Sequence, residues 1–310
     1  MIGIVILNYI KWEDTEKCIK SIINNEKNKN YHIYIVDNNS PIKIPEYLKA
    51  IVNENNFITF IENKINGGYN AGNNVGILRA IKDGCKEILV SNSDIVFKKN
   101  SITNMKSYLD QNENVGIVGP KIYLPNNKIQ MINMGTRTGL KEKYMYLLKK
   151  TPFSFFVKDF LNKYCALRND LKTPFKVHAV SGCCFMISHK CVKDIAPFDE
   201  KVFLYHEEVI LGELMEKKGF DTYYLTNSEV VHEHGQSTKH LRAFAYTCFV
   251  ESEIYFLKKY SAQKSYKILP LYIIRSSKYL IQCIKSEDFR NNFRKYFYNT
   301  TKALIKKQEA

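Results

Sequence analysis

The first 120 residues alternate between short apolar runs and helical patterns, and this alternation restricts the fold more than any other feature of the chain. Residues 2–7 form a continuous apolar run typical of a buried strand, and residues 32–36 form a second strand pattern. Apolar side chains recur at helical spacing over residues 70–81. Strands that alternate with helices of this length predict an α/β fold with a mostly parallel central sheet, flanked by helices that cross over it in the right-handed sense.

The alternation weakens after residue 120, and the later segments differ in character. Residues 137–176 are basic and aromatic with weak periodicity, which predicts an insertion or a mobile loop. Residues 206–218 have a helical pattern that ends at Gly219, as a C-cap would. The chain from about residue 240 onward is predominantly helical in pattern. We therefore predict an α/β domain over residues 1–240 and a basic helical extension over residues 241–310.

The formal net charge of +15 is concentrated near the end of the chain, where fifteen lysines and arginines stand against five acidic residues from Lys239 onward. Nucleic acid, an anionic membrane surface or a codon bias toward lysine could each account for it. The basic residues carry no recognisable nucleic-acid-binding signature, so no nucleic acid partner is expected. Residues 269–284 interleave Leu, Ile and Tyr with Arg275 and Lys278, which fits a peripheral membrane helix and a core-packing helix equally well.

Several protein classes are disfavoured by composition. The chain has no run of about 18 uncharged apolar residues, so no membrane-spanning helix is expected. The first residues resemble a strand rather than a signal peptide, which predicts a cytoplasmic location. The eight cysteines include no CxxC pair, which argues against a zinc site and a disulfide framework.

A carboxylate follows one of the apolar runs directly. Residues 87–91 are rich in aliphatic side chains, and they lead into Asn92, Ser93 and Asp94. This order places Asp94 at the carboxyl edge of the predicted sheet, where open α/β sheets bind ligands. A carboxylate there can hold a hard divalent cation together with phosphate oxygens, although an aspartate in a solvated turn would give the same short pattern.

Two further polar segments follow predicted strands. Asp37 and Asn38 begin a short polar cluster after the strand at residues 32–36; such a cluster can hydrogen-bond a flat heterocycle or simply form a turn. Residues 66–74 are rich in glycine and asparagine and precede a helix, an arrangement that allows close backbone approach to an anion. The segment matches neither a P-loop nor GxGxxG, so functions based on those motifs lose support.

Carboxylates and histidines occur together in two later segments. Glu208 lies in the first turn of the predicted helix at residues 206–218, where the helix dipole would favour its ionised form and allow it to act as a general base. Stabilisation of the helix end is the simpler explanation of the same carboxylate. Residues 229–234 look like a short strand that places His232 and His234 on one face, where they could ligate a metal or be merely hydrogen-bonded.

The order of these segments resembles the inverting family 2 glycosyltransferases of the GT-A fold, in particular their bacterial rhamnosyltransferase-like branch. Each matching motif is modest in specificity, but their shared order covers roughly residues 2–260. The matching segments are residues 6–9, 36–40, 66–76, 91–94, 119–122, 181–183, 198–200, 203–208 and 232–237.

The resemblance implies a role for each candidate residue. Asp94 and His232 would lie at a metal–diphosphate site that takes Mn²⁺ or Mg²⁺, and Glu208 would deprotonate the acceptor hydroxyl. The remaining candidates would contact the nucleotide, ribose and sugar of the donor: Asn8, Tyr9, Asp37, Asn38, Asn66, Gly68, Asn70, Asn74, Asn92 and Ser93.

Three positions depart from the usual pattern of that family. Glu208 stands where an aspartate is usual, so the catalytic carboxyl is one methylene longer. Ile210 stands where a further acid is common. Asn92 replaces the first acid of the metal motif, as is common in this branch, and leaves Asp94 as the sole anionic ligand.

The resemblance thus predicts a metal-dependent, inverting glycosyltransferase of bacterial surface polysaccharides, such as capsule or O-antigen. Its donor would be dTDP-rhamnose or a UDP-hexose, and its acceptor a glycan or a polyprenyl-linked saccharide. The basic extension would place it in the cytoplasm, peripherally at the inner face of the cell membrane. A catalytically weak or silent GT-A nucleotide-binding protein and a nucleotidyltransferase are the alternatives.

Overall fold

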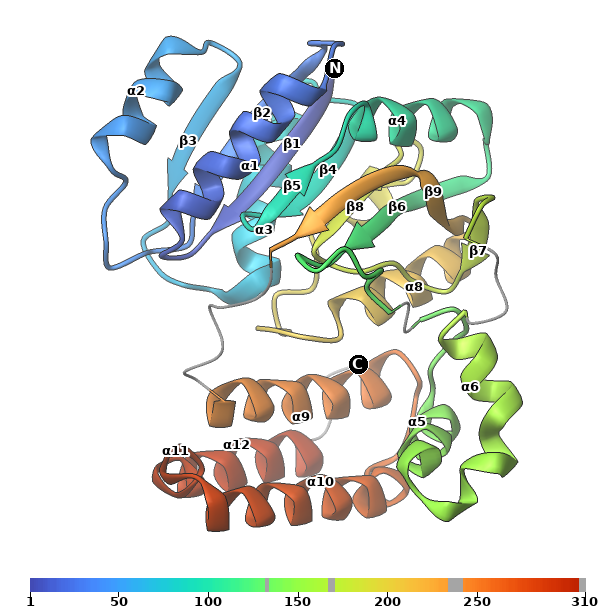
Figure 1. Ribbon diagram of the computed structural model, residues 1–310. Coiled ribbons are helices and arrows are strands. Elements are labelled where there is room, and N and C mark those ends of the chain that lie inside the picture. The colour runs from blue at the N-terminus through green and yellow to red at the C-terminus, as the bar shows by residue number, and fades with distance from the viewer. Residues whose placement is uncertain (132–133, 167–170, 234–241, 307–310) are drawn as a thin grey trace.

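The computed structural model describes residues 1–131, 134–166, 171–233 and 242–306 (Figure 1). Its N-terminal half is the predicted alternation of strands and helices. Strands β1, β2, β3 and β4 run parallel to one another in the order β3-β2-β1-β4. The elements of this half are β1 (Ile2–Asn8), α1 (Trp12–Asn25), β2 (Tyr31–Asp37), α2 (Glu46–Glu54), β3 (Ile58–Glu62), α3 (Gly68–Lys82) and β4 (Glu87–Asn92).

The second half of the sheet is mixed rather than parallel. Beyond β4 the order continues β8-β6-β9-β5, with β7 paired to β9, and β8 runs antiparallel to both of its neighbours. The chain reaches β8 from β6 through a long insertion instead of a single crossover helix, so nothing imposes a parallel return. The elements are β5 (Ile95–Phe97), α4 (Ser101–Gln111), β6 (Val115–Tyr123), β7 (Phe175–Val177), β8 (Cys184–Ile187), α7 (Val192–Ile195), α8 (Glu207–Lys218) and β9 (Asp221–His232).

Strand β9 runs without a break from Asp221 to His232, where the sequence pattern suggests two short strands, at residues 221–225 and 229–234. Its pairing with β6 is irregular between Leu225 and Glu229, which lie opposite the adjacent residues Pro120 and Lys121. This irregularity interrupts the apolar pattern without ending the strand. The continuous strand carries His232 to the edge of the sheet at which β4 ends.

Helices cover both faces of the sheet, as predicted, and each face has its own apolar core. One core packs α1, α2 and α4 against the sheet through side chains such as Ile19, Leu48 and Met105. The other packs α3, α7 and α8 against the opposite face through Ile77, Ile195 and Leu211. The site described below lies between these layers, at the carboxyl ends of β1, β2 and β4.

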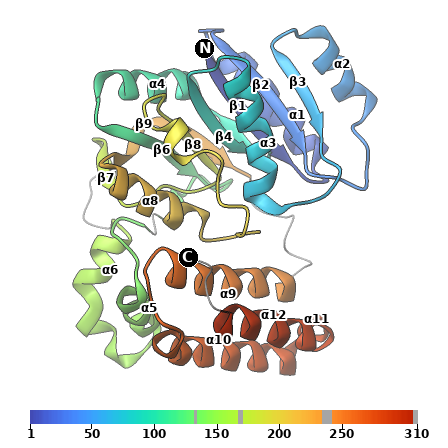
Figure 2. The same cartoon turned by 180° about the vertical axis from the view of Figure 1, so that it is seen from behind.

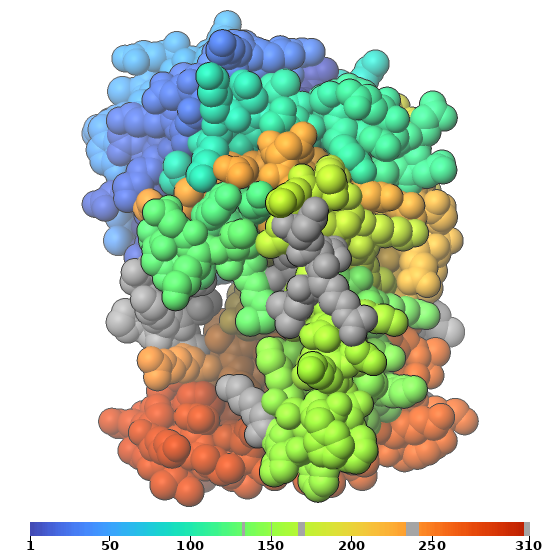
Figure 3. All heavy atoms as spheres, turned by 45° about the vertical axis from the view of Figure 1, so that its right-hand side comes forward, coloured from blue at the N-terminus to red at the C-terminus, as the bar shows by residue number. Residues whose placement is uncertain are grey.

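The basic segment expected as an insertion or a mobile loop contains short helices in its described part. They are α5 (Leu140–Leu147), the 3₁₀ helices η1 (Leu148–Lys150) and η2 (Pro152–Val157), and α6 (Lys158–Tyr164). Figure 3 shows this segment in light green, reaching from the sheet domain down to the C-terminal helices.

The C-terminal region is helical, as predicted. It contains α9 (Arg242–Lys259), α10 (Ser265–Lys285), α11 (Glu287–Asn291) and α12 (Phe293–Ile305), which form a layer below the sheet domain in Figures 1 and 2. A third apolar cluster joins these helices to Val209 and Ile210 of α8. None of the helices in the described residues combines the length and the hydropathy that a bilayer crossing requires.

Candidate active site

The carboxyl ends of three neighbouring strands bring the first candidate residues together. Asn8 at the end of β1 pairs in register with Asp37 at the end of β2, and Leu7 pairs with Asn92 at the end of β4. Parallel strands in register place their last residues at one edge of the sheet. Asn8, Asp37 and Asn92 therefore lie along a common edge, as the sequence predicts.

Asp37 is held in a fixed orientation by its neighbours. Its Oδ1 accepts hydrogen bonds from the Asn8 side chain at 3.2 Å and from the Ser40 hydroxyl, and its Oδ2 accepts one from the Ser40 backbone N–H at 3.2 Å. The Ser40 hydroxyl also accepts a hydrogen bond from the Ile10 backbone at 2.7 Å. The turn after β2 is thereby tied to the loop after β1 that contains Tyr9.

The side chain of Asn38 connects this edge to the glycine-rich segment. Its Nδ2 donates to Asn66 Oδ1 at 2.9 Å and to the Gly68 carbonyl at 3.1 Å. Gly68 has φ +87°, and a Cβ at that position would lie 2.3 Å from the Phe203 carbonyl oxygen. Gly68 is therefore required for the close packing of α3 against the segment that precedes α8.

Asn70 and Asn74 fasten α3 to another loop. Asn70 donates to the Asp199 carbonyl at 2.8 Å, and Asn74 exchanges hydrogen bonds with the Phe198 backbone at 2.7 and 2.9 Å. Both side chains are buried. The structure gives these amides an anchoring role, and their contact with a ligand stays a prediction.

Asp94 and His232 meet at the same edge of the sheet. Asp94 lies in the turn between β4 and β5, and the pairing of Ile95 with His232 brings the histidine beside it. His232 Nε2 lies 3.3 Å from Asp94 Oδ1, and His232 Nδ1 lies 3.1 Å from Gln130 Oε1. Burial lowers the pKa of an imidazole, but the hydrogen bond and charge of Asp94, aided by the Cys183 thiol, raise the pKa of His232 to about 10.

The donor set around Asp94 suits a metal that is shared with a substrate. Among the described residues, no three His, Cys, Asp or Glu side chains converge as a complete protein site would require. Mg²⁺ usually takes one or two protein carboxylates and completes its shell with phosphate oxygens and water. Asp94 and His232 fit such a partial site, in which a metal would take the place of the proton on His232, because a metal-bound imidazole is deprotonated. Asn92 and Ser93 lie directly before Asp94; His234 falls outside the described residues.

Glu208 lies in the first turn of α8 and lines a cavity of about 160 Å³. Its Oε1 accepts a hydrogen bond from the Gly182 backbone N–H at 3.2 Å. A Cβ on Gly182 would lie 3.2 Å from this oxygen and 3.4 Å from Glu207 Oε1, so the glycine allows both carboxyl groups to approach the backbone. Gln130, which contacts His232, lines the same cavity, so the Asp94–His232 pair lies next to a residue of this cavity.

The ionisation of Glu208 differs from the expectation. The helix dipole predicts a stabilised carboxylate, whereas burial raises the pKa of Glu208. Burial and the charge of Glu208 raise the pKa of Glu207 further, well above its ordinary value. Desolvation outweighs the dipole because Glu207 is buried and Glu208 is only partly exposed. A carboxylate with a raised pKa is a stronger base than an exposed glutamate, which suits Glu208 to accept a proton.

Ile210 is explained by packing. It is buried in the cluster that joins α8 to the C-terminal helices. An acid at this position would be a buried charge in that interface. The chain thus uses this side of α8 for attachment of the helical layer.

Three features of the site have little signal in the sequence. Gln130 lies in a segment without periodicity, and only its contact with His232 reveals it. Gly182 lies in a motif of the resembled family, but its closeness to Glu207 and Glu208 depends on the tertiary fold. Tyr69 donates a hydrogen bond to the Gly182 carbonyl and so joins the start of α3 to the same carboxyl pair.

A sheet with polar strand ends at one edge and a carboxyl-lined cavity beside them is the arrangement of the GT-A fold. Solved structures with this fold are similar to the model. GalNAc-T7 with UDP, GalNAc and Mn²⁺ gives a TM-score of 0.56 at 14% identity, over 76% of this chain and 43% of that one. Residues 1–349 of TarS from S. aureus also give 0.56, at 11% identity, over 98% and 81% of the two chains. The predicted fold is confirmed.

The chain belongs to glycosyl transferase family 2, whose model matches residues 3–196. A hexosyltransferase of low-salt glycan biosynthesis, Agl10 of Haloferax volcanii, is 26% identical over 209 residues, which are 67% of this chain and 59% of that protein. The N-acetylglucosaminyl-diphospho-decaprenol L-rhamnosyltransferase of Mycobacterium tuberculosis is 25% identical over 158 residues, 49% of this chain and 48% of that protein. The chain thus spans between about half and three fifths of these relatives' lengths.

Proposed function

We propose that the protein is an inverting glycosyltransferase that moves a sugar from a nucleotide-sugar donor to a hydroxyl group of a glycan or lipid-linked acceptor. The observation that carries the proposal is that Gln130, which contacts His232 of the Asp94–His232 pair, lines the same cavity as Glu208. This arrangement would supply a place for the leaving diphosphate and a base near it. The similarity to hexosyl- and rhamnosyltransferases supports dTDP-rhamnose or a UDP-hexose as the donor, and synthesis of a bacterial surface polysaccharide as the context.

The reaction we propose is a single displacement at the anomeric carbon. The acceptor oxygen forms the new bond as the bond from that carbon to the diphosphate oxygen breaks, and the hydroxyl proton passes to the Glu208 carboxylate. Asp37 and Asn8 would bind the base of the nucleotide. Mn²⁺ or Mg²⁺, held by Asp94 and His232, would supply charge neutralisation for the diphosphate.

Burial of Glu208 has a consequence for this step. Its raised pKa makes the carboxylate a better proton acceptor, while burial and the charge of Glu208 favour the neutral form of Glu207. Within the described residues the Oε2 atom of Glu207 is buried without a hydrogen-bond partner, which suits a protonated carboxyl better than a charged one. Only one negative charge then develops at the start of α8.

We also propose that residues 241–310 hold the enzyme peripherally at an anionic membrane, on its cytoplasmic side, and that residues 1–240 form the catalytic domain. Helix α10 supports this proposal because its exposed side is apolar, and it contains no acidic residue. Its exposed large apolar side chains, 36% to 81% accessible, are Tyr266, Leu269, Ile273, Ile274, Leu280, Ile281 and Ile284; we name them the α10 apolar face.

A second element extends the same side of the molecule. Phe153, Phe155 and Phe156 of η2 are also exposed, and the segment between α5 and α6 lies with α10 along the lower edge in Figures 1 and 2. Aromatic and aliphatic side chains flanked by lysines are typical of helices that lie in a membrane interface. The two elements together would form the contact with lipid.

A nucleotide screen tests the proposed activity. Thermal shift is measured for the full chain with UDP- and dTDP-sugars in the presence of Mn²⁺ or Mg²⁺, followed by release of the nucleoside diphosphate. We expect stabilisation by one nucleotide class and slow release from its sugar derivative. Stabilisation without any release, even with candidate acceptors, would favour a silent nucleotide-binding protein, and no response to any nucleotide would refute the proposal.

A further inference from the structure

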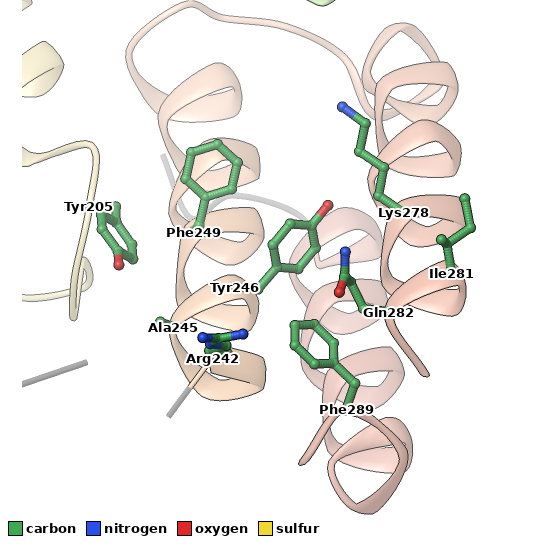
Figure 4. Close-up of a pocket in the computed structure, with 9 residues that line it drawn as sticks. All are labelled: Tyr205, Arg242, Ala245, Tyr246, Phe249, Lys278, Ile281, Gln282 and Phe289. Carbon is green, nitrogen blue, oxygen red and sulfur yellow. The ribbon is translucent and has the colours of Figure 1, made fainter. Parts of the chain in front are cut away.

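A pocket in the helical layer lies outside the candidate active site. It has a volume of about 640 Å³ and lies between α9, α10 and α11, with Tyr205 on its far side (Figure 4). Its lining residues are Tyr205, Arg242, Ala245, Tyr246, Phe249, Lys278, Ile281, Gln282 and Phe289. Nothing in the proposed mechanism uses this pocket.

The lining favours an anion that carries an apolar group. Arg242 and Lys278 are its charged residues, and none of the described lining residues is acidic. Guanidinium and ammonium groups bind phosphate through charge-assisted hydrogen bonds. The rings of Tyr205, Tyr246 and Phe249 supply apolar walls between these cations, which a small inorganic anion would leave unused.

The pocket is continuous with the α10 apolar face. Ile281 belongs to both, and Lys278 and Gln282 lie on the neighbouring turn of the same helix. Figure 4 shows these three side chains on α10, across from Arg242 and Tyr246 on α9. A ligand with its charged group between the two cations can therefore extend an apolar chain past Ile281 toward the surface that we propose contacts lipid.

The pocket also adjoins the segment that carries the proposed base. Tyr205 and His206 both have positive φ, 68° and 67°, and α8 with Glu208 begins directly after them. The ring of Phe249 lies 6.1 Å from that of Tyr205 and 5.2 Å from that of His206, measured between centroids. One wall of the pocket is thus the turn that leads into the candidate active site.

We propose that this pocket binds the phosphate or diphosphate head of a lipid-linked acceptor, with Arg242 and Lys278 as the anion ligands and Ile281 at the exit of the lipid chain. The inference rests on the proposed function, because the ligand it names is the lipid-linked acceptor of that transferase. It adds the acceptor's carrier group, and the residues that recognise it, to that function.

Direct binding of farnesyl diphosphate to the full chain tests the inference. The measurement is made by calorimetry in EDTA without nucleotide, so that a metal at Asp94 does not bind the diphosphate. We expect the R242Q/K278Q variant to bind at least about ten-fold more weakly than wild type, because two charged hydrogen-bond donors are lost. The matched control is K267Q/K285Q, which removes the same charge from exposed positions of α10 outside the pocket and should bind within about two-fold of wild type.

Two further probes show whether the pocket recognises both the diphosphate and the apolar chain, as a lipid-linked head group requires. Farnesol and inorganic diphosphate should each bind at least about ten-fold more weakly than farnesyl diphosphate, since each lacks one half of the recognised group. Equal binding of inorganic diphosphate, or an equal loss in the control variant, would overturn the inference. The melting temperatures of all variants should match that of wild type, because the substituted side chains are exposed.

Failure of this inference is distinguishable from failure of the proposed function. A wild-type protein that binds a nucleotide sugar and releases its diphosphate, yet does not bind farnesyl diphosphate, refutes the pocket assignment alone. A protein that binds no nucleotide refutes the proposed function, whatever the pocket binds.

Discussion

At the scale of single residues, the candidate site depends on two acidic side chains in different surroundings. Asp94 is partly accessible and is paired with His232, which suits a carboxylate that shares a metal with a substrate. Glu208 is withdrawn into a cavity, where burial raises its pKa and increases its basicity. The different environments fit the two roles that we propose, one carboxylate for the leaving group and one for the acceptor proton.

Replacement of Asp94 tests its proposed role at the metal and the leaving group. We expect Asp94→Asn to weaken nucleotide binding in Mn²⁺ by at least about ten-fold, or roughly 1.4 kcal/mol, because the anionic metal ligand is lost. In EDTA, the variant and wild type should bind the nucleotide equally. Calorimetric titration with UDP and dTDP measures both.

Asp14→Asn is the matched control. The charge of Asp94 contributes to raising the pKa of Asp14, so the two carboxylates are close enough to interact, but Asp14 is not proposed as a ligand. The control should retain metal-dependent binding. A similar loss of nucleotide affinity in both variants would show that Asp94 acts only through its negative charge and not as a metal ligand.

At the scale of elements, the start of α3 is fitted closely to the segment before α8. The Tyr69 backbone N–H donates to the Phe203 carbonyl at 2.7 Å, and Gly68 leaves no room for a side chain there. Because α8 carries Glu208 a few residues later, this contact positions the proposed base relative to the strand ends. The packing of α3 against the segment before α8 thus determines where Glu208, the proposed base, lies.

Substitution of Gly68 tests this fit. We expect Gly68→Ala to lower the free energy of unfolding by about 3 kcal/mol, since it adds a backbone clash to the strain of positive φ. Gly84→Ala is the control, because Gly84 has φ +82° but nothing within 4 Å of its Cβ position. The control should lose only about 1 kcal/mol. Equal losses of unfolding free energy in denaturant titrations of the two variants would show that close packing at Gly68 does not contribute to stability.

The strand ends of the candidate site could be predicted from the sequence, but the partners of the buried asparagines could not. The strand ends at Asn8, Asp37 and Asn92 were predictable because alternating β and α patterns force parallel strands to end at one edge. The anchoring roles of Asn70 and Asn74 were not, since their partners at residues 198–200 are more than 120 positions away in the chain. Local patterns predict an element and its direction, whereas side-chain partners depend on tertiary packing.

At the scale of the whole molecule, a buried ionic cluster ties the three parts together. Glu253 of α9 pairs with Arg275 of α10 through two hydrogen bonds of 2.8 Å and lies 3.3 Å from Lys143 of the insertion. Lys143 Nζ lies 2.9 Å from Nε2 of His206, the residue that precedes α8. Despite its burial, the two cations and their hydrogen bonds lower the pKa of Glu253 to about 2.

Neutralisation of Glu253 should therefore loosen the assembly. We expect Glu253→Gln to lower the free energy of unfolding at pH 7 by about 3–5 kcal/mol, since two buried cations lose their partner. The exposed Glu287→Gln should change it by less than about 0.5 kcal/mol. Urea titrations compare the two variants, and equal stabilities would contradict the account.

The same pKa shift predicts a pH dependence. The folded-state pKa of about 2 lies below the ordinary value of 4.5, so the contribution of Glu253 is fully present above pH 4.5 and is lost as the pH falls toward 2. Wild type should therefore lose roughly 3 kcal/mol more than Glu253→Gln across this window. If the free energy of unfolding depends on pH equally in wild type and Glu253→Gln, the lowered pKa of Glu253 is contradicted.

The proposed contact of the α10 apolar face with a membrane predicts a loss of vesicle binding when this face is made polar. We expect an Ile273→Asp/Ile284→Asp variant to bind phosphatidylglycerol-containing vesicles about ten-fold more weakly, because two aliphatic side chains no longer enter the interface. Ile42→Asp, which changes an exposed isoleucine on the sheet domain, is the control. Cosedimentation measures the bound fraction, and unchanged binding of the double variant would place the membrane contact elsewhere or exclude it.

The central claim is that Glu208 is the base of the transfer, and the Glu208→Gln variant tests it most directly. With the donor identified by the nucleotide screen, turnover should fall by about 10²- to 10⁴-fold while nucleotide affinity stays within about two-fold of wild type. Glu207→Gln, which imitates the protonated neighbour, should retain turnover within about five-fold. Retained turnover in Glu208→Gln, or loss of nucleotide binding together with turnover, would contradict the assignment.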